Sequence, residues 1–211
     1  MKTQNAVELF QYWNRLRGGA QAPARTKIEP SDIRNVLAST FILETTGDSD
    51  DLLFRLAGTA ICNLLGNQLR GTSIRNLFQD KHKPVVSRLM RTCYNTGSVL
   101  LLGFDGTTRS GRSTIIEILM LPLQDENNGH RILGCMSPHQ FQFWHGLEAV
   151  NTIELHSIRL IDPDREPLFL ANRPAIGLPP ALVPNEQQLQ ITPAASHKSK
   201  LQLMVIQGGK T

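Results

Sequence analysis

Residues 52–66 read LLFRLAGTAICNLLG and contain the most informative change of structure in the chain. The apolar, β-prone run Leu52–Ala57 predicts a strand. Gly58 breaks that strand and lets the chain turn sharply, Thr59 can cap a helix, and Gly66 ends it. A strand that passes into a helix through a single glycine indicates an α+β domain, in which helices pack on a sheet.

The segments on either side extend this pattern to a whole domain. Upstream, Phe41–Thr46 predicts a second strand, which forms an antiparallel hairpin with Leu52–Ala57 through the turn-rich residues 47–51. Downstream, Lys83–Asn95 has apolar residues at helical spacing and predicts a long helix that ends at Gly97. Three β-prone runs separated by turns follow, Ser98–Asp105, Ser113–Leu123 and His130–Ser137. Two strands, a helical crossover and a three-stranded meander predict an α+β fold with a five-stranded antiparallel sheet and helices on one face.

Arg55 lies in the first of these strands between two apolar residues. By strand alternation, its side chain points to the face opposite that of Phe54 and Leu56. There it can pair with the carboxylate of Glu44 on the neighbouring strand, or it can lie in solvent. Both interpretations remain open from the sequence.

An amphipathic helix precedes the sheet domain, with Asn5 as a possible cap and Gly18–Gly19 at its end. It forms an N-terminal flank over residues 1–20, ahead of the domain at 21–150. Its apolar side chains either pack on their own domain or form an oligomer interface. We expect a homodimer through four of them, Val7, Phe10, Trp13 and Leu16.

The composition changes near residue 150. Seven of the twelve prolines lie in the last part of the chain, at 163, 167, 174, 179, 180, 184 and 193. Ile153–Ile161 predicts one more strand or a transition from helix to strand, and Leu201–Ile206 is a final β-prone run. Residues 151–211 are therefore expected to form a partly ordered appendage with two possible β-segments.

Charge and cysteine usage exclude several classes of protein. The 22 basic residues exceed the 18 acidic ones by only four and are interspersed with them, whereas binding to nucleic acid needs a clustered basic face. No apolar run is long enough to insert into a membrane. The three cysteines, Cys62, Cys93 and Cys135, form no C-x-x-C motif and fit a reducing, cytoplasmic compartment.

The sequence offers no catalytic site. The six histidines form no H-E-x-x-H motif, which argues against a metal site, and no G-x-S-x-G nucleophile elbow occurs. Paired carboxylates at 50–51 and 125–126 fall in turns, where solvated charge is the ordinary role. We therefore expect a protein that is not an enzyme.

Several short motifs resemble one known family. Tyr12–Trp13 and Leu16–Gly19 are followed by Pro23–Arg25, and Phe54–Thr59 reads FRLAGT. This order resembles the alphaproteobacterial single-domain PAS family called PAS_5, which opens on Y-W-x-x-L-R-x-G and P-x-R and has F-R-L-A-G-T where a strand meets a helix. The resemblance implies a PAS fold and a cytoplasmic sensor or adaptor with no attached kinase or cyclase, and it implies no catalytic residues.

The common cofactors of PAS domains are disfavoured by the same comparison. Haem-binding PAS domains ligate iron through a histidine inside the long helix, whereas His82 stands at its start, before Pro84. Flavin-binding PAS domains carry the stretch N-C-R-F-L-Q, whereas Cys62 lies in ICNLL. An unidentified small ligand remains possible.

Eight apolar residues are candidates to line a pocket between the sheet and the helices, Leu56, Leu64, Val86, Met90, Leu102, Ile118, Met120 and Met136. They either bind a small apolar or amphipathic ligand or simply fill a core, a role to which methionine is well suited. We expect a sensory or regulatory module that acts through a regulatory protein partner, and the alternative is a sensor of a small molecule or cofactor.

Overall fold

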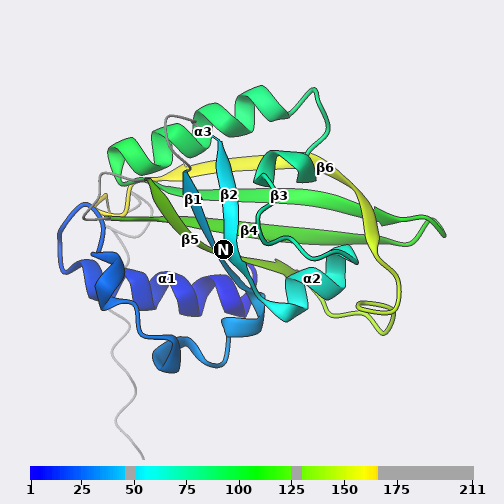
Figure 1. The fold of residues 1–211 in the computed structure, drawn as a ribbon, viewed down its shortest axis with the longest axis horizontal. Coiled ribbons are helices and arrows are strands. Elements are labelled where there is room, and N and C mark those ends of the chain that lie inside the picture. The colour runs from blue at the N-terminus through cyan, green and yellow to red at the C-terminus, as the bar shows by residue number, and fades with distance from the viewer. Residues whose placement is uncertain (46–50, 125–129, 166–211) are drawn as a thin grey trace, which may run out of the picture. The chain divides into compact units, whose positions relative to one another are not determined.

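The computed structural model describes residues 1–45, 51–124 and 130–165. Within them lie three α-helices, six strands and four short 3-10 helices (Figure 1). The helices are α1 (Gln4–Arg17), α2 (Thr59–Leu65) and α3 (Lys83–Thr96). The strands are β1 (Thr40–Thr45), β2 (Leu52–Ala57), β3 (Val99–Thr108), β4 (Ser113–Leu123), β5 (Arg131–Pro138) and β6 (Val150–Ile161). The 3-10 helices are Arg25–Lys27, Pro30–Ile33, Leu37–Ser39 and Ile74–Leu77.

The sheet confirms the α+β class and has one strand more than expected. Its order is β2-β1-β5-β4-β3-β6, and every neighbouring pair is antiparallel. The first five strands are those predicted from the sequence. The sixth, β6, pairs along the whole of β3, so Ile153–Ile161 belongs to the sheet and not to an appendage. The sheet is thus six-stranded because the chain returns to cover the edge of β3.

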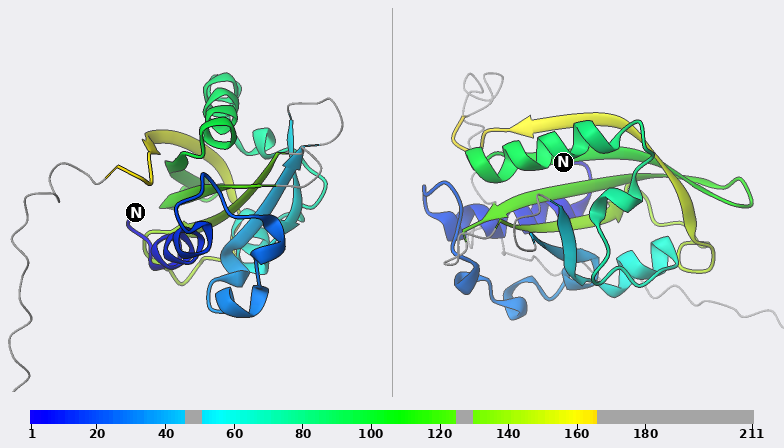
Figure 2. Two further views of the ribbon diagram at one scale, coloured as in Figure 1. Left: turned by 90° about the vertical axis from the view of Figure 1, so that its left-hand side faces the viewer. Right: turned by 45° about the horizontal axis from the view of Figure 1, so that its top comes forward.

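Helices cover both faces of the sheet, which corrects the expectation of helices on one face. Figures 1 and 2 show α3 on one side and α1 on the other. The face of α2 and α3 buries one apolar cluster, which includes Phe41, Phe54 and Phe104. The face of α1 buries a second cluster, which includes Leu9 and Trp13. The chain therefore has two cores that share one sheet.

The N-terminal end of α1 is fixed to the middle of β4. Thr3 is its N-cap, and the Thr3 hydroxyl accepts a hydrogen bond from the backbone N–H of Ala6; the expected cap, Asn5, is already inside the helix. The buried Glu117 carboxylate accepts bonds from the backbone N–H groups of Lys2 and Thr3 and from the Thr3 hydroxyl, at 2.8–3.1 Å. A buried anion thus satisfies N–H groups that a helix start leaves unpaired.

The C-terminal end of α1 is fixed to the end of β6. Gly18 ends the helix with φ 55°, as the sequence indicates. The Arg17 side chain is buried, lies over the ring of Trp13, and donates to the backbone carbonyl of Pro163 and to the carboxylate of Asp164 at 3.3 and 2.7 Å. Residues 1–20 are therefore an integral layer of the domain, and Met1–Pro167 form one compact unit.

The last residues of β2 do not follow the simple alternation of buried and exposed side chains. The β1–β2 register shifts by one residue, so that Leu43 pairs with Phe54 whereas Ile42 pairs with Leu56, which leaves Arg55 as the extra residue of a bulge. Such a bulge turns the following side chain to the other face. Leu56 is consequently 44% exposed and does not reach the interior.

Gly58 is required by a close contact. It has an ordinary φ of −67° and is itself the N-cap of α2, whereas Thr59, the expected cap, is the first helical residue. A Cβ at Gly58 would stand 2.2 Å from the carbonyl oxygen of Ala38. The glycine therefore lets β2 and α2 join directly beneath the preceding chain.

The predicted β-run 201–206 and the proline-rich segment before it lie outside the described residues. The boundary expected at residue 150 coincides with the start of β6, inside the unit Met1–Pro167. In the part of the chain that the structure describes, none of the helices has the length and apolar character needed to cross a bilayer.

Candidate functional site

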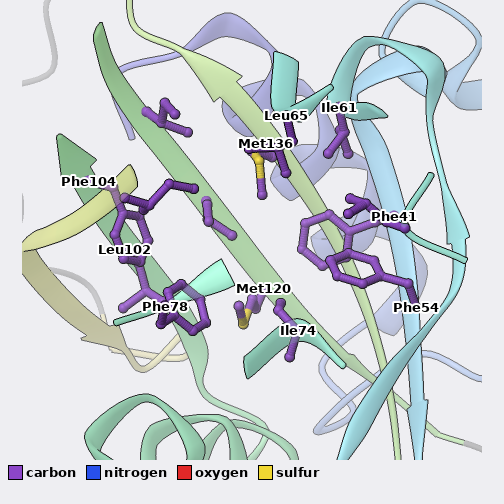
Figure 3. Packing of buried hydrophobic residues seen from close by; sticks show 14 of the residues in the cluster. Phe41, Phe54, Ile61, Leu65, Ile74, Phe78, Leu102, Phe104, Met120 and Met136 are labelled. Atoms are coloured by element: carbon purple, nitrogen blue, oxygen red, sulfur yellow. The ribbon is translucent and has the colours of Figure 1, made fainter. Parts of the chain in front are cut away.

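Seven of the eight candidate pocket residues come together between the sheet and the helices. Each is buried, with at most 4% of its surface exposed, and all belong to the cluster beneath α2 and α3. Figure 3 shows Met136 beside Leu65, and Leu102 beside Phe78 and Phe104. The seven are Leu64, Val86, Met90, Leu102, Ile118, Met120 and Met136.

Aromatic rings occupy much of this interior. Phe41 and Phe54 pack edge to face at 5.6 Å, and Phe78 stacks on Phe104 at 5.2 Å. A Cβ at Gly134 of β5 would lie 2.2 Å from the Phe41 ring, so the absence of a side chain there makes room for that ring. Packing of this kind gives the cluster the character of a core.

All three cysteines are free and buried. Burial raises the pKa of Cys93 and of Cys135 to about 12, so both thiols stay protonated at neutral pH. The Cys62 thiol lies near the carbonyl oxygen of Ala57, at 4.0 Å. Cys62 and Cys93 thus act as small buried hydrophobes.

The histidines in the described part of the chain do not form a metal site. Among the described residues, no group of three or more His, Cys, Asp or Glu side chains is arranged to hold a metal ion. His82 stands at the N-cap of α3 and is half-buried, and its Nε2 is buried without a hydrogen-bond partner in the described structure. His82 is therefore at the start of the long helix, as expected, but it is not fully solvated.

Arg55 combines the two roles that the sequence left open, an ion pair with Glu44 and an exposed side chain. Arg55 Nε lies 3.7 Å from the carboxylate of Glu44, and Arg131 of β5 approaches the same carboxylate at 3.6 Å. The Arg55 side chain is more than half exposed. This pair lies on the surface and marks the register of the strands, not a reactive centre.

The candidate interface on α1 is divided by the structure. Trp13 is fully buried against the sheet of its own chain, and its indole N–H donates to the carbonyl of Pro122 at 2.8 Å. Val7, Phe10 and Leu16 are only partly exposed. Of the four predicted interface residues, Trp13 therefore packs on its own domain, and the other three are partly exposed at the surface of α1.

A surface feature not predicted from the sequence lies in the segment 139–149 between β5 and β6, which we name the aromatic loop. Phe141, Phe143 and Leu147 are 82%, 79% and 81% exposed, the highest values among the exposed large apolar side chains. Trp144, in contrast, is buried, and its indole N–H donates to the side chain of Gln142. The run FQFWHGL after a predicted strand was the available signal, because it places four large apolar residues in a segment expected to be a connection.

The aromatic loop is held in shape by its own bonds. The backbone N–H of Gln142 donates to His145 Nδ1 at 3.1 Å, and the N–H of His145 returns a bond to the Gln142 carbonyl at 3.0 Å. The Arg112 guanidinium lies over the Phe143 ring at 5.1 Å and 3.4 Å from the Glu148 carboxylate. The exposed apolar side chains are thus presented on an ordered segment.

Comparison with known proteins places the chain in one family. The model of the family PAS_5, described as a PAS domain, matches residues 1–137. That match includes the segments quoted above from α1 and from the junction of β2 with α2. Among curated proteins, none matches the chain.

Several solved structures are similar at low sequence identity. A light-oxygen-voltage domain studied with a flavin analogue has 15% identity and a TM-score of 0.41, over 51% of this chain and 82% of that one. An RNA-binding light-oxygen-voltage receptor has 14% identity and a TM-score of 0.41, over 59% and 36%. The light-state Aureochrome1 LOV domain, a blue-light photoreceptor, has 14% identity and a TM-score of 0.39, over 57% and 94%.

Proposed function

Because the chain belongs to the PAS_5 family of PAS domains, we propose that it is a cytoplasmic regulatory module of the alphaproteobacterial single-domain kind, which acts by binding a partner protein. The observation that carries the proposal is the aromatic loop. Its three apolar side chains are exposed on a segment that hydrogen bonds hold in place. Large apolar side chains exposed together on one short segment are a common feature of interaction sites in soluble proteins.

The test removes the apolar surface and keeps the loop. A variant with Phe141, Phe143 and Leu147 changed to serine retains Trp144 and His145, which hold the loop in shape. We expect it to fold as the wild type does and to lose the partner that the wild-type chain captures in its own host. The matched control changes three other exposed apolar residues to serine, Leu37, Leu56 and Ile115, which are 38–44% exposed. Capture of the same partners by the loop variant as by the wild type would contradict the proposal.

We also propose that the module is a homodimer, with Val7, Phe10 and Leu16 of α1 at the contact. Sedimentation equilibrium on wild type and on a Phe10→Glu variant tests this arrangement. Dimerisation that is unchanged in the variant would remove α1 from the interface. Trp13 cannot contribute in this arrangement, because it is buried against the chain's own sheet.

The alternative function is a sensor that holds a ligand between the sheet and the helices. A flavin or a haem does not fit the residues found there. The inward residues of β3, β4 and β5 are apolar, so the polar edge of a flavin ring would be buried without hydrogen bonds. Haem is disfavoured by position, since His82 is the N-cap of α3, whereas the haem-ligating histidine of PAS domains lies inside the long helix. The alternative function is therefore a sensor that binds a small apolar ligand between the sheet and the helices.

An absorbance scan and native mass spectrometry of the purified full chain separate these functions. Protein-bound visible absorbance would contradict our exclusion of haem and flavin. A mass above 23.5 kDa for one chain, stable after desalting, would favour the sensor.

We propose further that the protein is not an enzyme, and the buried thiols with their raised pKa support this, because a nucleophilic cysteine needs an accessible thiolate.

A further inference from the structure

A cavity lies outside the apolar interior, between α1, α2, the end of β5 and the aromatic loop. Its volume is about 320 Å³, which is at the lower end of the range for small-molecule sites. Leu64 and Met136, both buried in the core, form part of its wall. Asn5 of α1 and Asn63 of α2 add amide groups. The cavity thus combines an apolar wall with groups that form hydrogen bonds.

The lining of this cavity contains no charged residue. Three other cavities in the described part of the chain differ in this respect, since their linings include Glu117, Arg109 and Asp105 respectively. A charged ligand in the uncharged cavity would lose water without gaining a counter-charge. The chemistry therefore selects an uncharged ligand.

His145 gives the cavity a donor that nothing in the described structure uses. Its side chain lines the cavity and is about nine-tenths buried. Nδ1 accepts the bond from Gln142, so the proton of the neutral ring is on Nε2, and Nε2 is buried without a partner. Burial lowers the pKa of His145, which keeps the ring neutral at pH 7. A buried N–H without an acceptor is costly, and a ligand oxygen would relieve that cost.

Access to His145 is controlled by an exposed ring. Phe141 packs edge-on against the imidazole at 5.4 Å, while Trp144 holds the imidazole at 4.3 Å. Phe141 is itself 82% exposed, so turning its ring aside sacrifices little buried surface. Phe141 can thus admit a ligand while Trp144 keeps the imidazole in position.

We propose that this cavity binds a small, uncharged, amphipathic molecule whose carbonyl or hydroxyl oxygen accepts the Nε2–H of His145 and whose apolar part rests on Leu64, Met136 and Phe141. The site is distinct from the interior between the sheet and the helices, and it goes beyond the proposed function, because a ligand can bind here whether or not the aromatic loop binds a protein. Phe141 belongs to both features. Occupancy of the cavity and partner binding at the loop are therefore coupled.

The test uses acetophenone as the probe, because it joins one carbonyl to one apolar ring and carries no charge. Benzoate, which has a similar shape and a negative charge, is the matched comparison. Both are titrated into the isotope-labelled full chain and followed by two-dimensional amide NMR. We expect acetophenone to shift the signals of Asn63, His145 and Gly146 to saturation, and benzoate to bind at least tenfold more weakly. Shifts confined to interior residues, no saturable shift, or equal binding of benzoate would overturn the proposal.

Two variants link the binding to the named groups. His145→Phe keeps an aromatic ring and removes the donor, and it should weaken acetophenone binding by about five- to tenfold. His156→Phe, at a histidine outside this cavity, is the control and should bind as the wild type does. If His145→Phe does not fold, Ala60→Phe takes its place as the test variant. Ala60 lies on the exposed side of α2 and lines the cavity, so the new ring would fill the cavity and abolish acetophenone binding. Unchanged affinity in the variant that decides would refute the site.

Discussion

The buried Glu117 carboxylate makes a direct test of how α1 is held on the sheet. Glu117→Gln preserves the size of the side chain and removes its charge. Only one of the two carboxylate oxygens remains as an acceptor for the N–H groups of Lys2 and Thr3, and the new amide group brings two donors toward them. At least one buried donor is then left without a partner.

The magnitude follows from the bonds that are lost. A hydrogen bond to a charged group contributes about 1.5–3 kcal/mol net, and an unpaired buried donor costs about 1–3 kcal/mol. Because the bonds at Glu117 are shared among neighbouring donors and are not additive, we expect a loss of about 2–4 kcal/mol in the free energy of unfolding at pH 7. That is a large share of the roughly 5–15 kcal/mol that a domain of this kind possesses.

The effect depends on pH in a defined direction. Burial raises the pKa of Glu117, but the hydrogen bonds from Thr3 and Lys2 lower it more, so the pKa in the folded state lies below the ordinary value of 4.5. A carboxyl of this kind stabilises the fold above its unfolded pKa, and the contribution is lost as the pH falls through the folded pKa. The difference between wild type and variant is therefore full at pH 7 and narrows in acid below about pH 4.5.

Urea unfolding followed by tryptophan fluorescence at pH 7 and in acid measures both effects. The control is Glu154→Gln, which removes an exposed carboxylate paired with Lys81 and should leave the stability unchanged within the error of the measurement. Amide exchange adds a local readout, since α1 should lose protection first. Two results would refute the reasoning. One is a loss of unfolding free energy in Glu117→Gln no larger than that in Glu154→Gln. The other is a difference between wild type and Glu117→Gln that is as large in acid as at pH 7.

Three further substitutions or reactions test the packing. Gly134→Ala should destabilise the fold by about 1–3 kcal/mol in the same urea assay, because its Cβ would lie 2.2 Å from the Phe41 ring and 2.5 Å from the backbone carbonyl oxygen of Leu119, and wild-type stability would show that both the ring and the strand can shift. Cys93 and Cys135 should resist a thiol reagent at pH 8 in the folded protein and react fully in denaturant, since burial raises the pKa of each to about 12; rapid reaction without denaturant would contradict this. Arg55→Ala should change stability by less than about 0.5 kcal/mol, because its ion pair is exposed, and a larger loss would give the pair a structural role.

Local patterns in the sequence were sufficient for the elements that depend on nearby residues. The helix α3, its end at Gly97 and the β1–β2 hairpin follow from periodicity and turn residues, whereas the pair of Arg55 with Glu44 was one of two roles that the sequence left open. Of the eight residues predicted for the interior, seven are buried there, because strand and helix periodicity indicates which side of an element is buried.

The failures arise where residues far apart in sequence meet. The role of Glu117 cannot be predicted from its own strand, because α1, more than 100 residues away in sequence, covers that side of the sheet and binds the carboxylate through Thr3. Leu56 was assigned to the interior because alternation does not reveal the bulge at Arg55. The cavity beside His145 depends on four separate segments of the chain, and no spacing within any one of them signals it.

The attachment of α1 has a consequence for the order in which the protein is made. Trp13 bonds to a residue 109 positions later, Thr3 to one 114 later and Arg17 to one 147 later. A ribosome must therefore release most of the domain before its first helix finds a surface to cover. Until then the apolar side of α1 has no native partner, which is a condition under which nascent chains aggregate or engage chaperones. Because α1 is synthesised long before the strands that it covers, its docking depends on contacts between residues far apart in sequence, and we expect folding to be slow for a domain of this size.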